Sequence, residues 1–170
     1  ARRRFVSYPP VSHIASDTCP SAARSWRTVV DITHPTGHAD GALVARGTIN
    51  SGFVLYVHEG RLQFDYNCFH VHTLAVANAP ISPGDHRLTL DVHRLPDGDA
   101  EVTLSVDAVV VAQAHIPRLL FVLSSIGMDL GRSLSPVNDT YQAPFNYPGH
   151  IHRIVFELED KATRGETKAA

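Results

Sequence analysis

The sequence predicts an all-β protein, an antiparallel β-sandwich of the jelly-roll kind. Many short stretches alternate apolar and polar residues, which is the period-two pattern of a strand with one face in a core. Clusters of Gly, Pro, Asn and Asp lie between these stretches and predict turns. No stretch shows the apolar stripe of an amphipathic helix. Short strands in close succession favour two packed sheets.

The clearest element is a β-hairpin over Ser51–Asn67. Its first half is apolar on both faces, so we expect that strand to lie deep in a sheet. Its second half is apolar on one face and polar on the other. The connector His58-Glu59-Gly60 ends in Gly, which adopts a left-handed turn conformation without a Cβ clash. The polar face of the second strand carries Arg61, Gln63, Asp65 and Asn67.

The other strands follow from the same alternation and from the turn residues between them. Asp107-Ala108 joins two of them where Asp-Gly would be the usual pair. Leu119–Leu130 is apolar but interrupted by Ser and Gly, so its state is left open, and Ser133–Pro148 is predicted to be a loop. The predicted strands are Trp26–Thr33, Gly41–Gly47, His72–Ala77, Asp85–Leu95, Glu101–Val106, Val109–His115 and His150–Glu159.

Chain length and composition favour one domain with a real core, at 170 residues and 44% apolar residues. Residues 1–25 are rich in Pro and small residues and predict an extended, irregular connector with a solvated basic start. Residues 26–159 form the predicted sandwich, and residues 160–170 a frayed polar tail. We expect the segment to come from a larger protein, with the connector leading from an upstream catalytic domain.

The charge balance argues against two classes of partner. Net charge is −2 with neutral histidines, which gives no general attraction to nucleic acid or anionic membrane. No apolar run approaches the roughly 20 residues of a spanning helix. Cys19 and Cys68 are too few for a secretory disulfide framework and are expected to be free thiols. The sequence assigns no compartment.

Two histidine pairs have spacing that suits a metal ion. His70 with His72, and His150 with His152, each place two imidazoles on one strand face, which can bind zinc or iron. Exposed strand histidines are the favoured alternative, because no carboxylate follows His72 closely. Asp129–Arg132, followed by Asn138 and Asp139, could form an oxygen-rich loop that binds Ca²⁺, and a plain turn is favoured there too.

No catalytic residue is predicted. A Gly-x-Ser-x-Gly nucleophile elbow, a P-loop and a dinucleotide glycine pattern are all missing from the sequence. Pro20 directly follows Cys19, which differs from the Cys-x-Pro-Ser-Arg segment that sulfatases convert to formylglycine. Aromatic residues of the hairpin region could stack on a sugar, although core packing is favoured for Phe64. These aromatic residues are Tyr56, Phe64, Tyr66 and Phe69.

An ordered set of short segments, each unspecific by itself, spans most of the chain from Arg24 to Glu159. In chain order they are Arg24-Ser25-Trp26, Gly41–Gly47, Gly52-Phe53, Leu55-Tyr56, Gly60, Phe64, Tyr66-Asn67, Pro83–His86, Leu104–Asp107, Ile116–Arg118, Asp129–Arg132, Ser135–Val137, Tyr141, Pro144–Tyr147 and Gly149–Ile151. Together they resemble the C-terminal domain of bacterial arylsulfatase-like proteins. That domain is similar to concanavalin A-like and laminin-G-like jelly rolls.

The resemblance implies a non-catalytic accessory domain of a sulfatase-like hydrolase of sulfuric esters. It implies a catalytic domain in cis as the partner, with a divalent cation such as calcium held there, and no cofactor in this chain. Carbohydrate or sulfate-ester substrate is a further possible partner. The alternative is a free-standing lectin-like carbohydrate-binding module. We expect an interface or ligand to contact Tyr56, Arg61, Gln63, Asp65, Tyr66, Asn67, Asp129 and Arg132.

Overall fold

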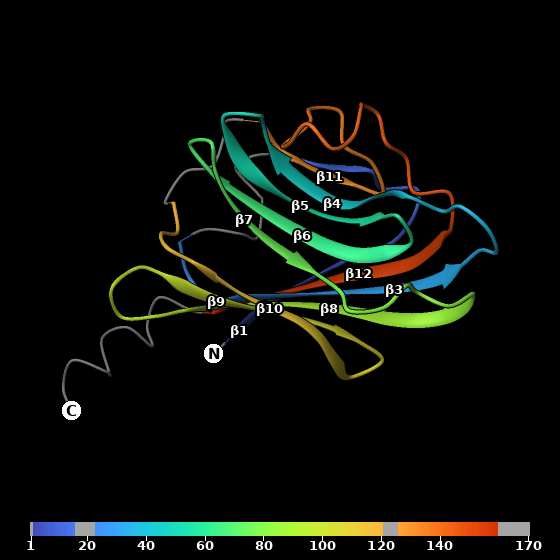
Figure 1. Ribbon diagram of the computed structural model, residues 1–170, viewed down its shortest axis with the longest axis horizontal. Helices are drawn as coiled ribbons and strands as arrows, with labels where there is room; N and C mark the ends of the chain where they lie inside the picture. Colours follow the sequence, from blue (N-terminus) through green and yellow to red (C-terminus); the bar gives the residue numbers. More distant parts are fainter. Residues whose placement is uncertain (1, 16–22, 121–125, 160–170) are drawn as a thin grey trace.

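Two antiparallel sheets packed face to face form the protein in the computed structural model, which describes residues 2–15, 23–120 and 126–159 (Figure 1). Within these residues each sheet has six strands. Sheet A has the order β1-β12-β3-β8-β9-β10, and sheet B the order β2-β11-β4-β5-β6-β7. The strands are β1 Arg2–Ser7, β2 His13–Ile14, β3 Trp26–His34, β4 Gly41–Gly47, β5 Ser51–His58, β6 Arg61–Cys68, β7 Val71–Val76, β8 Gly84–Arg94, β9 Ala100–Val106, β10 Val109–Ile116, β11 Met128–Leu130 and β12 His150–Glu159.

The predicted β-sandwich is therefore confirmed, and most strand bounds lie within one residue of the prediction. β4 and β12 have the predicted bounds, and β3 is one residue longer than expected. β3 alternates buried and half-buried residues along its whole length, as a strand with one face in the core requires. Ser133–Pro148 is a loop, as predicted, apart from isolated bridge pairing at Asn146.

The hairpin predicted over Ser51–Asn67 is β5 and β6, paired from Ser51 with Cys68 to His58 with Arg61. Its turn is one residue shorter than predicted, because His58 still pairs across the hairpin. Only Glu59 and Gly60 connect the strands, with φ of 50° and 74°. A two-residue turn with both φ values positive has the twist that suits a hairpin.

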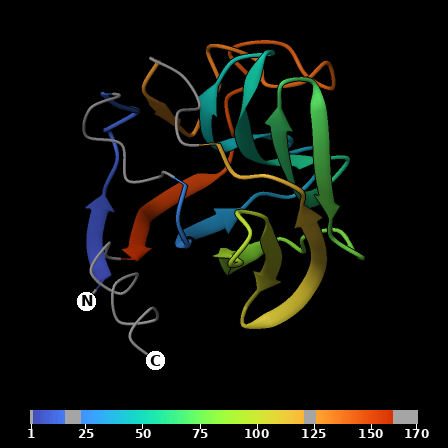
Figure 2. The ribbon, with the colours of Figure 1, turned by 90° about the vertical axis from the view of Figure 1, so that its left-hand side faces the viewer.

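The N-terminal residues correct the prediction of an irregular connector over residues 1–25. β1 pairs with β12, and β2 pairs with β11, so the first strand lies at the edge of sheet A and the second at the edge of sheet B (Figure 2). Phe5 and Ile14 pack against the core, while the side chains of Arg3 and Arg4 are exposed. Pairing at the sheet edges gives these short strands backbone hydrogen bonds, which the local sequence pattern does not predict.

The core between the sheets is built from the inward residues of both. Trp26 of β3 packs on Phe53 of β5 with ring centroids 5.6 Å apart, and Phe53 packs on Phe64 of β6 at 6.0 Å. All three side chains are buried, which confirms the prediction of core packing for Phe64. Within the described residues, no helix is long and apolar enough to cross a membrane.

Four predictions fall wholly or partly outside the described residues. They concern the thiol state of Cys19, residues 16–22 of the predicted connector, the frayed tail over residues 160–170, and residues 121–125 of the stretch Leu119–Leu130. Of that stretch, Met128–Leu130 forms β11. Cys68 is a half-buried free thiol, as expected.

Candidate functional site

The outer face of sheet B, where the sequence places most candidate contact residues, is covered by the loop of residues 131–147 (Figure 1). Val54 and Tyr56 of β5 point away from the main core and form a second apolar cluster with residues of this loop. Tyr141 stacks on Phe145 at 4.5 Å between ring centroids, and its ring lies 5.9 Å from that of Tyr56. We call this region the loop-covered face.

Backbone hydrogen bonds fix the loop on β4. Ala42 donates its amide hydrogen to the Phe145 carbonyl at 2.8 Å, and Gly131 donates to Leu43 at 2.8 Å. Gly41 has a specific role at this contact, since a Cβ there would overlap the backbone of Tyr147. The absence of a side chain at Gly41 lets the loop approach the strand closely.

Polar side chains of β6 also hold this loop in place. Asn67, fully buried, donates to the carbonyls of Ile49 at 2.7 Å and Val137 at 3.0 Å, and accepts from the amide of His70 at 2.8 Å. Asp65, 3% exposed, accepts from Asn138 at 2.9 Å. These groups satisfy one another, as buried polar groups must.

The polar face of the hairpin, where we expect an interface or ligand, is mostly buried in the folded protein. Gln63, Asp65 and Asn67 are buried, and Gln63 donates to the His58 carbonyl at 3.2 Å. Tyr56 is 1% exposed, so it cannot stack on a sugar in this conformation. Period-two alternation identifies the side of the sheet but gives no information about a loop that covers it.

Burial also sets the protonation of the tyrosines in this region. Desolvation raises the pKa of Tyr56 to about 12, and raises that of Tyr141 as well. Tyr66 lies on the other side of β6, in the main core, where burial raises its pKa to about 12 and its hydroxyl accepts from the Leu120 amide at 2.9 Å. These hydroxyls remain neutral hydrogen-bonding groups at ordinary pH.

The other candidate contact residues lie apart from one another. Arg61 is half-buried and donates to the Ala77 carbonyl at 3.0 Å. Asp129 lies on β11, where one oxygen faces His13 Nδ1 at 3.0 Å and the other accepts from the Leu134 amide at 2.8 Å. Arg132 Nε is 3.7 Å from Asp129. The oxygen atoms of the possible Ca²⁺ loop do not point to one site. Asp129 contacts the donors just named, and the Asn138 amide donates to Asp65.

The two histidine pairs differ. His70 lies in the turn before β7 with a φ of 71°, so it does not share a strand face with His72 as predicted. His72 Nδ1 lies 2.9 Å from both oxygens of Asp65, which as acceptors require the proton on this nitrogen. His150 and His152 do lie together, with ring centroids 4.4 Å apart. Among the described residues, no three His, Cys, Asp or Glu side chains are placed to hold a metal ion.

The outer face of sheet A, in contrast, carries charged side chains in cross-strand rows. Arg87 Nε is 2.8 Å and Arg153 Nε is 2.7 Å from the carboxylate of Asp31, and these residues lie directly opposite one another on β8, β12 and β3. Arg27 and Asp91 form another opposite pair at 2.8 Å. Hydrogen bonding from Arg87, then from Arg153, lowers the pKa of Asp31 against the opposing effect of burial.

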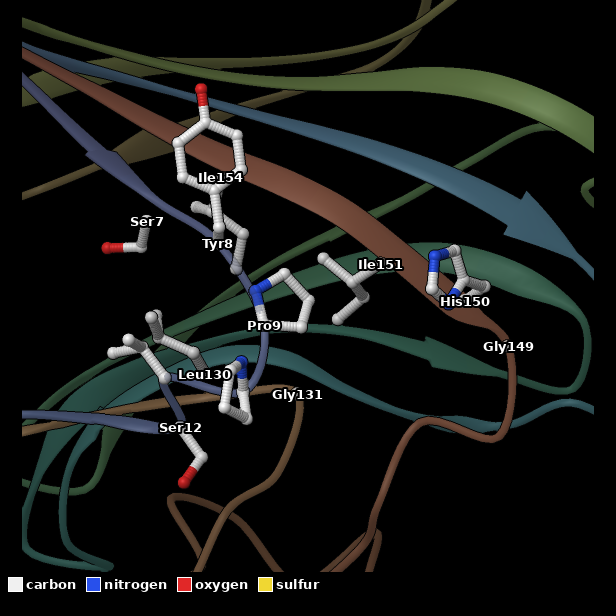
Figure 3. Close-up of a pocket in the computed structure, with 12 residues that line it drawn as sticks. Ser7, Tyr8, Pro9, Ser12, Leu130, Gly131, Gly149, His150, Ile151 and Ile154 are labelled. Atoms are coloured by element: carbon white, nitrogen blue, oxygen red, sulfur yellow. The ribbon is translucent and has the colours of Figure 1, made fainter.

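A pocket of about 260 Å³ lies where the N-terminal segment crosses from sheet A to sheet B (Figure 3). The segment between β1 and β2 forms one wall, and the ends of β11 and the start of β12 form the other. In Figure 3 the side chains of Pro9 and Ile151 lie between Tyr8 and His150. We call this the N-terminal pocket; it is lined by Ser7, Tyr8, Pro9, Pro10, Val11, Ser12, Leu130, Gly131, Gly149, His150, Ile151 and Ile154.

The N-terminal pocket combines an apolar floor with polar groups at its rim. Leu130 and Ile154 are buried, whereas Tyr8 is 57% exposed and His150 is exposed. An exposed aromatic ring beside hydroxyl groups offers both stacking and hydrogen bonding to a ligand. The sequence analysis did not predict this site. Tyr8-Pro9-Pro10 is the signal that could have indicated it, because the two prolines restrain the backbone and end the strand next to an aromatic side chain.

Comparison with known proteins places the fold. No protein-family model and no curated protein matches the sequence. Domains LG4-5 of the mouse laminin α1 chain superpose with a TM-score of 0.63 and 15% identity over 90% of this chain. The NanB sialidase of Streptococcus pneumoniae, solved in complex with 2-[(3-chlorobenzyl)ammonio]ethanesulfonate, superposes with a TM-score of 0.68 and 13% identity over 95% of this chain. A single-residue mutant of that sialidase superposes with a TM-score of 0.66 and 14% identity over 94% of this chain.

The chain spans 44% of the laminin chain and 27% of each sialidase chain. At these identities the likeness shows the fold alone, a concanavalin A-like β-sandwich. The fold expected from the sequence is thus confirmed by solved structures. A link to sulfatases is not among these findings, so the sulfatase parent stays a prediction.

Proposed function

We propose that this chain is a lectin-like carbohydrate-binding module and that the N-terminal pocket is its ligand site. The observation that carries the proposal is the exposed Tyr8 ring beside a hollow lined by prolines, apolar side chains and the serines Ser7 and Ser12. Sugars have an apolar C–H face and a polar edge, and this combination of groups suits both. The similarity to a sialidase domain and to laminin G domains supports a module of this kind in a larger protein.

The loop-covered face is a poor alternative ligand site. Its aromatic rings, Tyr56 and Tyr141, are buried and already packed on the loop of residues 131–147. Exposing them would require breaking the hydrogen bonds that Asn67 and Asp65 make to that loop. A sugar would have to replace a satisfied and well-packed contact, which is unfavourable. The N-terminal pocket is open without any such change.

The test is a glycan array followed by titration calorimetry with the purified chain. Wild type should bind at least one class of glycan, and Tyr8→Ala should weaken that binding roughly tenfold or more, because the stacking ring is lost. Phe69→Ala is the matched control, since Phe69 is 66% exposed and does not line the pocket. It should bind as wild type does.

Two results would contradict the proposal. A chain that unfolds cooperatively yet binds no glycan on the array is not a carbohydrate-binding module under these conditions. Tyr8→Ala with wild-type affinity would move the ligand site away from the N-terminal pocket. Thermal unfolding of each variant separates loss of binding from loss of fold.

The ordered motif set favours a second candidate, an accessory domain that packs in cis on a sulfatase-type catalytic domain. Segments from Arg24-Ser25-Trp26 to Gly149–Ile151 carry this resemblance. The test is whether the open reading frame extends upstream of Ala1 and contains a Cys-x-Pro-Ser-Arg segment. Its presence would support the accessory role, and its absence would remove it.

A further inference from the structure

Among the residues that the structure describes, those lining the N-terminal pocket include no Asp, Glu, Lys or Arg. Of its twelve residues only Tyr8 and His150 are titratable. A site for a charged sugar normally supplies an opposite charge, because a charged group that leaves water without a partner loses solvation free energy. The lining therefore matches a ligand group without charge.

The backbone inside the pocket is also largely committed to the fold. The Gly131 amide donates to Leu43 at 2.8 Å, and its carbonyl accepts from Tyr147 at 3.0 Å. The carbonyls of Ser12 and Tyr8 accept from Leu130 at 2.9 Å and Val11 at 3.1 Å. The polar side chains of the lining are those of Ser7, Tyr8, Ser12 and His150. The interior offers an apolar surface, chiefly Leu130, Ile151 and Ile154.

Charged groups adjoin the lining on two sides and contact other protein groups. Beside Leu130 and Gly131, Asp129 lies 3.0 Å from His13 and 3.7 Å from Arg132. The second cluster lies on the outer face of sheet A. Arg153 is one residue from the lining residue Ile154, but its Nε is 2.7 Å from Asp31, which also binds Arg87. The pKa of Arg153 is raised mainly by Asp31, and the Tyr8 hydroxyl contributes less. Next to His150, His152 Nε2 lies 2.7 Å from the Thr33 hydroxyl. These groups are engaged with protein partners on that face.

Resting on the proposed carbohydrate binding, we infer that the N-terminal pocket holds one neutral terminal sugar that inserts a methyl group. The methyl is that of a 6-deoxyhexose or of an N-acetylated hexosamine, and the ring hydroxyls contact the polar side chains of the lining. A volume of about 260 Å³ lies below the roughly 300–1,000 Å³ of sites for larger ligands and suits a single sugar unit. We expect acidic sugars, sialylated or sulfated, to bind less tightly than neutral ones, because the described lining residues supply no opposite charge.

Calorimetry with matched sugar pairs tests this inference. L-Fucose is compared with L-galactose, which adds a hydroxyl to the methyl, and N-acetylglucosamine with N-formylglucosamine, which lacks the methyl. At least one methyl-bearing sugar should bind about fourfold or more tightly than its partner, the factor expected for one buried methyl group. Tyr8→Ala should weaken binding of the preferred sugar.

Binding measured at low and high salt, and in the variant Arg153→Gln, tests whether charge contributes to affinity. Binding of a neutral sugar should change less than twofold between 50 and 500 mM NaCl, and less than twofold in Arg153→Gln, because neither alters an uncharged contact. Preference for sialylated or sulfated glycans, with affinity that falls in high salt and in Arg153→Gln, would overturn the inference while leaving the carbohydrate-binding function intact. Equal binding of both members of each pair would also overturn it. Absence of binding to any glycan would instead remove the proposed function.

Discussion

The outer faces of the two sheets carry polar residues with the same period-two pattern but use them differently. On sheet B the side chains of Gln63, Asp65 and Asn67 are buried under the loop of residues 131–147. On sheet A the side chains of Arg27 and Arg87 are 42% and 56% exposed and pair with carboxylates of neighbouring strands. The first face anchors a segment of chain, and the second is a hydrated, charge-paired surface.

The difference matters energetically because solvent access sets the value of a polar contact. A buried group that loses its partner retains the full cost of desolvation, whereas an exposed ion pair contributes little beyond what water provides. Mutations of equal chemical size should therefore have unequal effects on the two faces. The following predictions test this contrast, from the largest expected effect to the smallest.

Tyr56→Ala should be the most destabilising change. The ring is 1% exposed and lies within 6.3 Å of Phe145 and 5.9 Å of Tyr141, measured between ring centroids. Removing a buried aromatic ring costs about 4 kcal/mol in unfolding free energy and lowers Tm by roughly 10 °C or more. Urea and thermal unfolding measure both quantities. Phe69→Ala, at an exposed ring, should leave Tm nearly unchanged; equal losses for the two variants would contradict the burial of Tyr56.

Asn67→Ala should cost about 3 kcal/mol, because it leaves the Ile49 and Val137 carbonyls and the His70 amide without their partner. Hydrogen exchange should also become faster in the loop of residues 131–147, which Asn67 holds in place. Asn78→Ala is the control, since Asn78 is exposed and only its backbone amide is bonded. A cost below 1 kcal/mol for Asn67→Ala would show that the loop does not depend on this anchor.

Asp31→Asn should cost about 1 kcal/mol at pH 7, because two arginines lose their shared carboxylate. The folded-state pKa of Asp31 is lowered, so its contribution is present above its unfolded pKa near 4 and is lost as pH falls through the lower folded value. The difference between variant and wild type should shrink toward zero in acid. Urea unfolding between pH 2 and pH 7 measures it, and a difference that is constant with pH would exclude this linkage. Asp97→Asn, at an exposed turn, should show no such trend.

Arg27→Gln should have the smallest effect, at most about 0.5 kcal/mol. Arg27 and Asp91 are 42% and 35% exposed, so water replaces most of what their ion pair contributes. The small loss should become smaller still in 0.5 M NaCl, because salt screens the pair. A loss above 2 kcal/mol would show that this face of sheet A is shielded from solvent and would remove the contrast between the two faces.

Local pattern predicted the strands well where turn residues bound them on both sides. Gly41–Gly47 is preceded by a glycine-containing turn and begins and ends in Gly, and His150–Glu159 follows a Pro-Gly pair; both were predicted with their observed bounds. His70 was placed on a strand but lies in a turn, because the hairpin from β6 to β7 has its two turn residues at Phe69 and His70. β1 and β2 were missed, since their pairing with β12 and β11 involves residues more than 100 positions away.

The candidate site was much harder to predict than the fold. Tyr8 and His150 come from segments more than 140 positions apart in the chain, and only the crossing of the N-terminal segment from sheet A to sheet B brings them to one pocket. The hairpin residues that the sequence favoured are chemically suited to binding, but a distant loop covers them. Composition identified suitable side chains and could not say which of them remain open to solvent.

The sequence by itself determined the all-β class, most of the strands and the side of most of them that faces the core, because side-chain alternation and turn chemistry are local properties. Tertiary structure alone decided that Gln63, Asp65 and Asn67 anchor a loop, and that Tyr8 borders an open pocket. Solvent access at any residue depends on what packs over it, and that is set by contacts between segments far apart in the chain. Burial, and with it the choice of functional residues, is therefore a property of the folded molecule.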